Sequence, residues 1–229
     1  METPQVYPAR LVSRVLFTIF FVRCPVFGRK SIPADGTPYI LALNHSSIID
    51  PLLVCAFYPD RVHFLAKQEL HEMPLLGWGL RRSGSIPVRR GAFDLKAIRS
   101  SLAYLKERRL NLAIFVEGTR SGDGEVGEAK HGCALLAIKS GVPVVPAFSA
   151  GSFEVLPRAG FIPRFSNRLA IHIGEPLRFE SPTDRAGRVE RSELEKATTR
   201  ILESIELLNP DGAGPLAPKI PTHSRGGDR

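Results

Sequence analysis

Short β-rich runs alternate with helical patterns between residues 38 and 176, and this alternation limits the fold more than any other feature of the chain. We expect strands at residues 39–43, 62–66, 85–88, 111–116, 143–148 and 169–173. The run at 112–116 is apolar on both faces, which is typical of a central strand covered on both sides. The pattern predicts an α/β domain with a central mixed sheet flanked by helices.

Helical spacing of apolar residues separates these runs. The clearest helix is expected over residues 93–109, with Asp94 in its first turn. Shorter helices are expected after residue 50, before residue 82 and after residue 132. A last helix is predicted over 194–208, and Ser192 and Glu195 have the spacing of a capping box.

Composition divides the chain into three parts. Residues 209–229 hold four prolines and four glycines and too few apolar groups to fold, so we expect a disordered tail. Residues 31–208 are expected to form one folded domain, and residues 1–30 a separate N-terminal segment.

The N-terminal segment contains an uninterrupted apolar stretch at residues 15–22, between Arg14 and Arg23. A membrane-spanning helix needs about 20 mostly apolar residues, so this stretch is too short to span. No small-residue cleavage site of a secretory signal follows it. Two interpretations stay open: a short helix lying in a bilayer interface beside anionic headgroups, and an ordinary helix packed on the core.

The chain is basic, with 31 Lys and Arg against 23 Asp and Glu and a formal net charge of +8, so its partners are expected to be anionic. Nucleic acid is not expected, because the aromatic residues are mostly Phe in apolar runs and are not interleaved with basic residues. Cys24, Cys55 and Cys133 form no C-x-x-C pair, which indicates neither a disulfide framework nor a zinc site and fits a reducing cytoplasm.

The stretch most informative for chemistry runs from Asn44 to Asp50, where a strand leads into a helix. Asp50 precedes Pro51, which favours the first turn of a helix, so Asp50 is expected to be the N-cap. A tight loop would bring its carboxylate to Nδ1 of His45 and leave Nε2 as a base for a substrate hydroxyl. In the alternative interpretation Asp50 is only a helix cap and His45 is structural.

A second polar stretch, residues 115–121, leaves a buried strand and enters a loop at the kind of strand end where open α/β sheets build sites. Gly118 lets a ligand approach the backbone, Arg120 offers a planar fork for phosphate, and Glu117 could pair with Arg120 or bind hydroxyls. The alternative is a surface turn with an ion pair.

Cationic side chains stand at the ends of three separate strands: Lys67, Arg89, Arg90 and Arg120. Such a convergence suits one phosphate site, although a solvated arginine after a strand is common.

Residues 44–50 read NHSSIID, residues 84–90 read GSIPVRR, residues 115–121 read FVEGTRS and residues 142–146 read VPVVP. In order and spacing they are similar to the four motifs of the glycerolipid acyltransferases of the lysophosphatidic acid acyltransferase type, and residues 66–70 (AKQEL) also resemble that family. Val116 stands where the family usually has proline, and Arg89 where an acidic residue is common.

The resemblance implies that His45 and Asp50 form the catalytic pair. It also implies that five residues bind the acyl acceptor: Lys67, Arg90, Glu117, Gly118 and Arg120. The motif at 142–146 is linked to the acyl donor. No metal and no organic cofactor is expected.

The implied reaction moves a fatty acyl group from acyl-CoA or acyl-acyl carrier protein to the free hydroxyl of 1-acyl-glycerol 3-phosphate, giving phosphatidic acid for phospholipid biosynthesis. Residues 31–208 would be the acyltransferase domain, and residues 1–30 a monotopic or peripheral anchor at the cytoplasmic face of the cell membrane. Alternatives are acyl transfer to glycerol 3-phosphate or another lysophospholipid, and a non-catalytic protein that binds anionic lipid.

Overall fold

A computed structural model describes residues 15, 24–89, 94–157, 160, 162–164, 168–180 and 188–212. Within these ranges seven strands form one sheet in the order β1-β7-β6-β2-β5-β3-β4. The strands are β1 (Val26–Phe27), β2 (Ile40–Leu43), β3 (Val62–Lys67), β4 (Ile86–Val88), β5 (Asn111–Phe115), β6 (Val144–Ala150) and β7 (Ala170–Ile173). Only the β6–β7 pair is antiparallel in this described sheet, so the prediction of a mixed sheet is confirmed.

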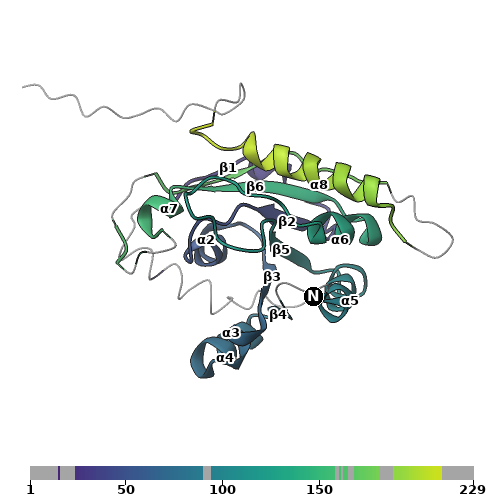
Figure 1. Cartoon of the computed structure of the whole chain (residues 1–229), viewed down its shortest axis with the longest axis horizontal. Helices are drawn as coiled ribbons and strands as arrows, with labels where there is room; N and C mark the ends of the chain where they lie inside the picture. The colour runs from purple at the N-terminus through teal and green to yellow at the C-terminus, as the bar shows by residue number, and fades with distance from the viewer. Residues whose placement is uncertain are drawn as a thin grey trace, which may run out of the picture.

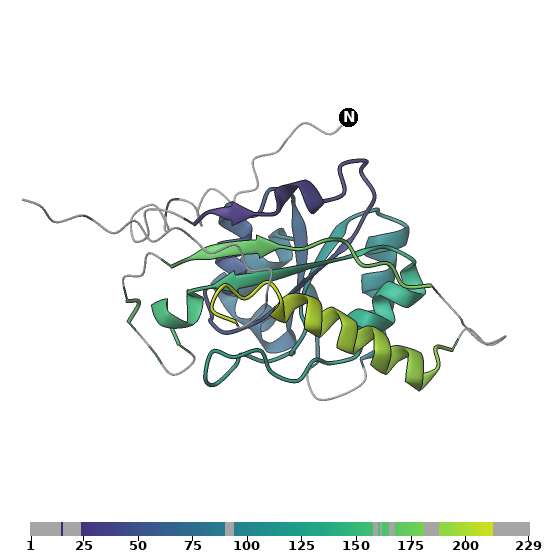
Figure 2. The same cartoon turned by 90° about the horizontal axis from the view of Figure 1, so that it is seen from above.

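The helices cover both faces of the sheet (Figure 1). They are α2 (Asp50–Phe57), α3 (Gln68–Glu72), α4 (Pro74–Arg82), α5 (Leu95–Lys106), α6 (Gly132–Ser140), α7 (Ser152–Val155) and α8 (Arg191–Glu206), with a short 3-10 turn at Arg29–Ser31. Figure 2 shows α8 crossing the sheet, where it contacts β6 and β2. Helix α2 lies on the opposite face (Figure 1).

Strand β2 shows why the central strands are apolar on both faces. Leu41 and Leu43 pack with Leu53 of α2, whereas Ile40 and Ala42 belong to the cluster under α5, α6 and α8. Successive side chains of a strand point to opposite faces, so a strand between two helical layers has no polar side. The six predicted strands are confirmed, and so are the helices expected after residue 50, before residue 82 and after residue 132.

The structure corrects two predicted helix starts. The helix expected at 93–109 begins at Leu95, and Asp94 is its N-cap, accepting hydrogen bonds from the backbone of Lys96 and Ala97. The last helix begins at Arg191, so Ser192 lies inside it and caps nothing. The capping-box prediction was wrong because this spacing also occurs within a helix that starts earlier.

Strand β1 was not expected from the sequence. Its two residues, Val26 and Phe27, pair with β7 at the edge of the sheet, within the stretch that composition placed in the N-terminal segment. Two residues are too few to show a periodicity, so no pattern could have predicted this strand. Gly28 follows at φ 73°, and a side chain there would collide with the Ile173 carbonyl.

Some expectations concern residues that the structure does not describe. The apolar stretch at 15–22 lies almost entirely outside the described residues, as does the tail after residue 212. Among the described residues, no helix has the length and apolar character needed to cross a bilayer. The same ranges contain no group of three or more His, Cys, Asp or Glu able to hold a metal ion. Cys24, Cys55 and Cys133 are free thiols.

Candidate active site

The carboxyl ends of strands β2 to β6 meet at one side of the sheet, which we call the carboxyl edge, because these strands run parallel. β2 leads into the loop at 44–49, and its neighbour β5 leads into the loop at 116–121. The two loops touch, since the backbone N–H of Ser121 donates to the carbonyl of His45 at 2.7 Å. The two polar stretches singled out in the sequence therefore lie side by side.

His45 and Asp50 form a buried pair at this edge. Nδ1 of His45 lies 2.9 Å from Oδ2 of Asp50, and the residues are 7% and 0% exposed. The imidazole stacks on the ring of Phe115, with centroids 4.2 Å apart and planes at 22°. Among the described residues none hydrogen-bonds to Nε2. With Nδ1–H directed at the carboxylate, Nε2 carries the lone pair and can accept a proton.

Asp50 does not cap helix α2 as predicted. The helix begins at Asp50 itself, and its N-cap, Ile49, makes no side-chain bond. The carboxylate turns back into the preceding loop, where Oδ2 accepts the backbone N–H groups of Ser46 at 2.9 Å and Ser47 at 2.8 Å as well as His45. These three donors on one oxygen hold the carboxylate toward the imidazole.

Strand β6 supports the pair from the other side. The Asn44 side chain pairs with the backbone of Ser149: Oδ1 accepts its N–H at 2.7 Å, and Nδ2 donates to its carbonyl at 3.3 Å. The Ser149 hydroxyl donates to Oδ1 of Asp50 at 3.2 Å. Sequence reasoning missed Ser149, because its contact with Asp50 depends on the β2–β6 neighbourhood. The only available signal was its place near the end of a predicted strand.

Serines of the loop anchor it to the chain after β6. Ser46 and Ser152 share a hydroxyl–hydroxyl bond of 2.8 Å, and the Ser47 hydroxyl donates to the carbonyl of Leu156 at 2.5 Å. The imidazole is thus carried by a loop whose polar groups are bonded on both sides.

Glu117 holds the backbone of His45. Its Oε1 accepts the His45 N–H at 2.8 Å and its Oε2 accepts the Gly127 N–H at 3.2 Å, and the residue is 5% exposed. Burial is the largest influence on the pKa of Glu117 and raises it, while the two backbone N–H groups lower it. The carboxylate oxygens are engaged by the backbone, a role that neither sequence interpretation included.

Gly118 makes the turn that follows. Its φ is 69°, in the left-handed region that favours glycine, and its N–H donates to the carbonyl of Phe115 at 3.0 Å. This turn directs the chain through Arg120 and back to His45 at Ser121.

The predicted cations lie on neighbouring strand ends. Lys67 ends β3, and its Nζ lies 3.0 Å from Oε1 of Glu69, with side chains 42% and 60% exposed. Arg89 follows β4 and donates from Nε to Oε1 of Gln68 at 2.9 Å. Arg120 lies in the loop after β5, between these strands and β2. Arg90 lies outside the described residues.

The motif at 142–146 lies at the opposite end of the sheet. Val144 starts β6 and pairs with Ile40 at the beginning of β2, and Val144 and Val145 are completely buried. These residues build the core beneath the site.

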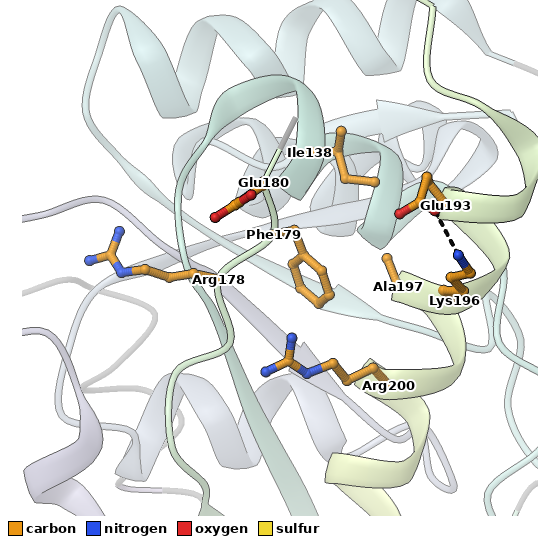
Figure 3. A pocket seen from close by; sticks show the side chains of 8 residues that line it. All are labelled: Ile138, Arg178, Phe179, Glu180, Glu193, Lys196, Ala197 and Arg200. Carbon is orange, nitrogen blue, oxygen red and sulfur yellow. Dashed lines mark hydrogen bonds and ion pairs between the residues drawn. The ribbon is translucent and has the colours of Figure 1, made fainter. Parts of the chain in front are cut away.

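A pocket near the same end is lined by α6, α8 and the segment 178–180 (Figure 3). Its charged groups interact locally: Lys196 pairs with Glu193 at 2.8 Å, and the Arg200 guanidinium lies 5.6 Å from the Phe179 ring centroid. None of the predicted site residues lines it.

The chain is similar in sequence and in fold to known acyltransferases. The sequence model of the family described as Acyltransferase matches residues 23–150, more than half of the chain. A chloroplastic 1-acyl-sn-glycerol-3-phosphate acyltransferase of Brassica napus is 28% identical over 193 residues, covering 82% of this chain and 53% of that protein. The chain thus spans about half the length of this relative.

Two further matches are bacterial. A lyso-ornithine lipid O-acyltransferase of Pseudomonas aeruginosa is 34% identical over 182 residues, 78% of this chain and 67% of that protein. The crystal structure of the 1-acyl-sn-glycerophosphate acyltransferase PlsC from Thermotoga maritima superposes with a TM-score of 0.65 and 28% identity, covering 86% of this chain and 77% of that one. With its fold, the buried His45–Asp50 pair and the match to the family model, this chain belongs to the acyltransferase family.

Proposed function

We propose that the protein transfers a fatty acyl group from a thioester, acyl-CoA or acyl-acyl carrier protein, to the free hydroxyl of 1-acyl-glycerol 3-phosphate, giving phosphatidic acid. The observation that carries this proposal is the His45–Asp50 pair, 2.9 Å apart, with Nε2 left without a hydrogen bond from the described residues. The relative from Brassica napus and the structure from Thermotoga maritima, both named for this activity, support it.

In the proposed mechanism Nε2 of His45 removes the proton of the acceptor hydroxyl. Asp50 fixes the tautomer and stabilises the imidazolium that forms. The alkoxide attacks the thioester carbonyl, the tetrahedral intermediate collapses, and the thiolate leaves and takes the proton from the imidazolium. These reaction steps use no nucleophile of the enzyme and no cofactor. A positioned base of this kind contributes about 10²–10⁴-fold.

The acceptor phosphate is held by Lys67, Arg90 and Arg120. The Lys67–Glu69 ion pair is largely exposed, so it is weak and Lys67 can exchange Glu69 for a phosphate oxygen. Glu117 and Gly118 shape the loop that presents Arg120, and Glu117 also fixes the backbone of His45. In this assignment the acceptor lies between the cations and the imidazole.

The acceptor and product are membrane lipids, and the acyl thioesters are soluble. We therefore place the enzyme at the cytoplasmic face of the cell membrane, as a monotopic or peripheral protein anchored by the part of the N-terminal segment that precedes β1, since Val26 and Phe27 belong to the sheet. Lipid bilayer and donor would then meet at the carboxyl edge.

The test is thiol release from palmitoyl-CoA and from palmitoyl-acyl carrier protein, with and without 1-acyl-glycerol 3-phosphate. We expect release that requires the acceptor and that is lost in His45→Ala, and the productive thioester identifies the donor. Absence of acceptor-dependent release from both donors would contradict the proposal.

The relative from Pseudomonas aeruginosa favours a second candidate acceptor, a lyso-ornithine lipid. That headgroup has no phosphate, whereas the cations at the carboxyl edge suit one. Running the same assay with both acceptors distinguishes them. A higher kcat/KM for the lyso-ornithine lipid would show that this lipid, and not 1-acyl-glycerol 3-phosphate, is the preferred acceptor, while the proposed acyl-transfer mechanism would stand.

A further inference from the structure

Helix α4 and the residue before it expose a cluster of large apolar side chains, which we call the α4 apolar tip. Its members and their exposed fractions are Met73 at 49%, Leu75 at 88%, Leu76 at 45% and Trp78 at 63%. Figure 1 shows α3 and α4 projecting from the β3–β4 end of the sheet, away from α8. Elsewhere in the described chain, exposed large apolar side chains are not gathered in this number on one helix.

The tip is mounted on α3 through small and polar groups. Gly77 approaches the carbonyl of His71 so closely that a Cβ would collide with its oxygen. Nη1 of Arg81 donates to the same oxygen at 2.5 Å. The buried His71 ring lies near the carbonyls of Lys67 and Ser85, which joins α3 to β3 and β4. Because α4 packs through Gly77, the side chains of Leu75, Leu76 and Trp78 are left exposed.

The distribution of charge along α4 matches an anionic bilayer surface. The apolar residues occupy the first half of the helix, and exposed Arg81 and Arg82 occupy its last turn. Tryptophan is favoured at the boundary of headgroups and acyl chains, and adjacent arginines attract anionic headgroups. Two arginines next to an apolar tip therefore favour a lipid surface.

We propose that the α4 apolar tip docks in the interface of a bilayer that contains anionic lipid. The proposal rests on the proposed function, in which the acceptor is drawn from that bilayer. Helix α3 starts immediately after Lys67, so docking of α4 holds the β3 end of the carboxyl edge next to the headgroups. An acceptor phosphate would then reach Lys67 while its acyl chain stays in lipid.

Trp78 is the only tryptophan in the chain, so its fluorescence reports on this site alone. The full chain is titrated with vesicles of phosphatidylglycerol and phosphatidylcholine, and with vesicles whose phosphatidylcholine has brominated chains. We expect a blue shift on binding and quenching by the bromines. Sedimentation with vesicles without any change in Trp78 emission would overturn the proposal and locate the membrane contact elsewhere. A shift caused by acyl carrier protein and not by vesicles would overturn it in favour of a protein partner.

A second measurement uses the double variant Leu75→Asp, Leu76→Asp. We expect its partition into anionic vesicles to fall at least tenfold. The matched control is Leu207→Asp, which removes a side chain 47% exposed at the end of α8, on the other side of the sheet. An equal loss of binding in the control, or no loss in the double variant, would contradict the proposal.

Activity separates this inference from the proposed function. The double variant should lose turnover of acceptor presented in vesicles and keep turnover of a short-chain acceptor dissolved as monomers. If the wild type turns over neither acceptor, the proposed function fails, while the Trp78 measurement still tests the docking surface.

Discussion

The two halves of the carboxyl edge are built in opposite ways. Around His45 the polar groups of the loop are buried and bonded, with Asp50, Glu117 and Ser149 each holding part of it. On the β3–β4 side the cation Lys67 is 42% exposed and bound to an exposed glutamate. A proton-transferring group must be fixed in one geometry, whereas a phosphate-binding group has to change partners when the ligand arrives. Substitutions in the buried half should therefore lower kcat, and substitutions in the exposed half should raise KM.

The largest effect is expected for Asp50→Asn. The neutral amide cannot stabilise an imidazolium and disturbs the tautomer of His45, so kcat should fall on the order of 10³–10⁴-fold. Steady-state kinetics with saturating acceptor measure this loss. Asp35→Asn is the matched control, because Asp35 is exposed, lies in a turn where it accepts the Thr37 N–H, and has no contact with the described candidate site residues. A loss of less than tenfold in Asp50→Asn would show that the pair is structural.

Glu117→Ala tests whether this residue belongs to the buried half. The variant loses the carboxylate that accepts hydrogen bonds from two backbone N–H groups. This loss should lower the free energy of unfolding by about 1–3 kcal/mol and lower kcat more than it raises KM. Chemical denaturation and kinetics measure the two effects. An unchanged kcat with a much higher KM would instead make Glu117 an acceptor ligand.

The pH dependence of stability tests the burial of the same carboxyl group. Burial raises the pKa of Glu117 above its usual 4.5, so the folded state holds this proton at pH values where the unfolded chain has lost it. The free energy of unfolding should therefore fall as pH rises through this window. The difference between wild type and Glu117→Gln should show that fall in denaturation curves from pH 4 upward. A difference that is constant with pH would mean that burial does not govern this group.

Lys67→Ala tests the exposed half. Loss of one phosphate contact should raise KM for 1-acyl-glycerol 3-phosphate roughly 10- to 150-fold, with kcat changed little, since a charge-assisted bond contributes about 1.5–3 kcal/mol. Stability should stay within about 0.5 kcal/mol because exposed ion pairs contribute little. Lys196→Ala removes a similar paired lysine from α8 and should change neither constant. A large loss of kcat in Lys67→Ala would contradict the division of the carboxyl edge into a buried half that affects kcat and an exposed half that affects KM.

The smallest effect is expected for Gly118→Ala. An alanine in the left-handed backbone region lowers the stability of the fold by about 1 kcal/mol, and a Cβ at this position would lie 3.4 Å from Cγ of Lys130. Gly141 has a φ of 73° and no atom within 4 Å of a Cβ, so Gly141→Ala carries the same backbone cost away from the site. Both variants should lose similar stability, and only Gly118→Ala should lose activity, by a few-fold. Equal activity in the two would show that the turn does not present Arg120.

The sequence by itself determined the local structure and the chemistry-bearing residues. Strand β2, with apolar residues on both faces, and the helix around Leu95 were predictable because side-chain periodicity is a local property. The junction of strand and helix around His45 and Asp50 was predictable for the same reason, since the two residues are only five positions apart in the chain.

Only the tertiary structure decided what holds that pair. Ser149 is 105 residues from Asn44, and Glu117 is 72 residues from His45; these contacts exist because β6 and β5 flank β2. Asp50 is bound both by its own loop, through the backbone N–H groups of Ser46 and Ser47, and by the distant Ser149 hydroxyl of β6. Strand order and the contacts of Ser149 and Glu117 with the site arise from the packing of residues far apart in the chain. Periodicity and spacing along the chain do not predict such packing.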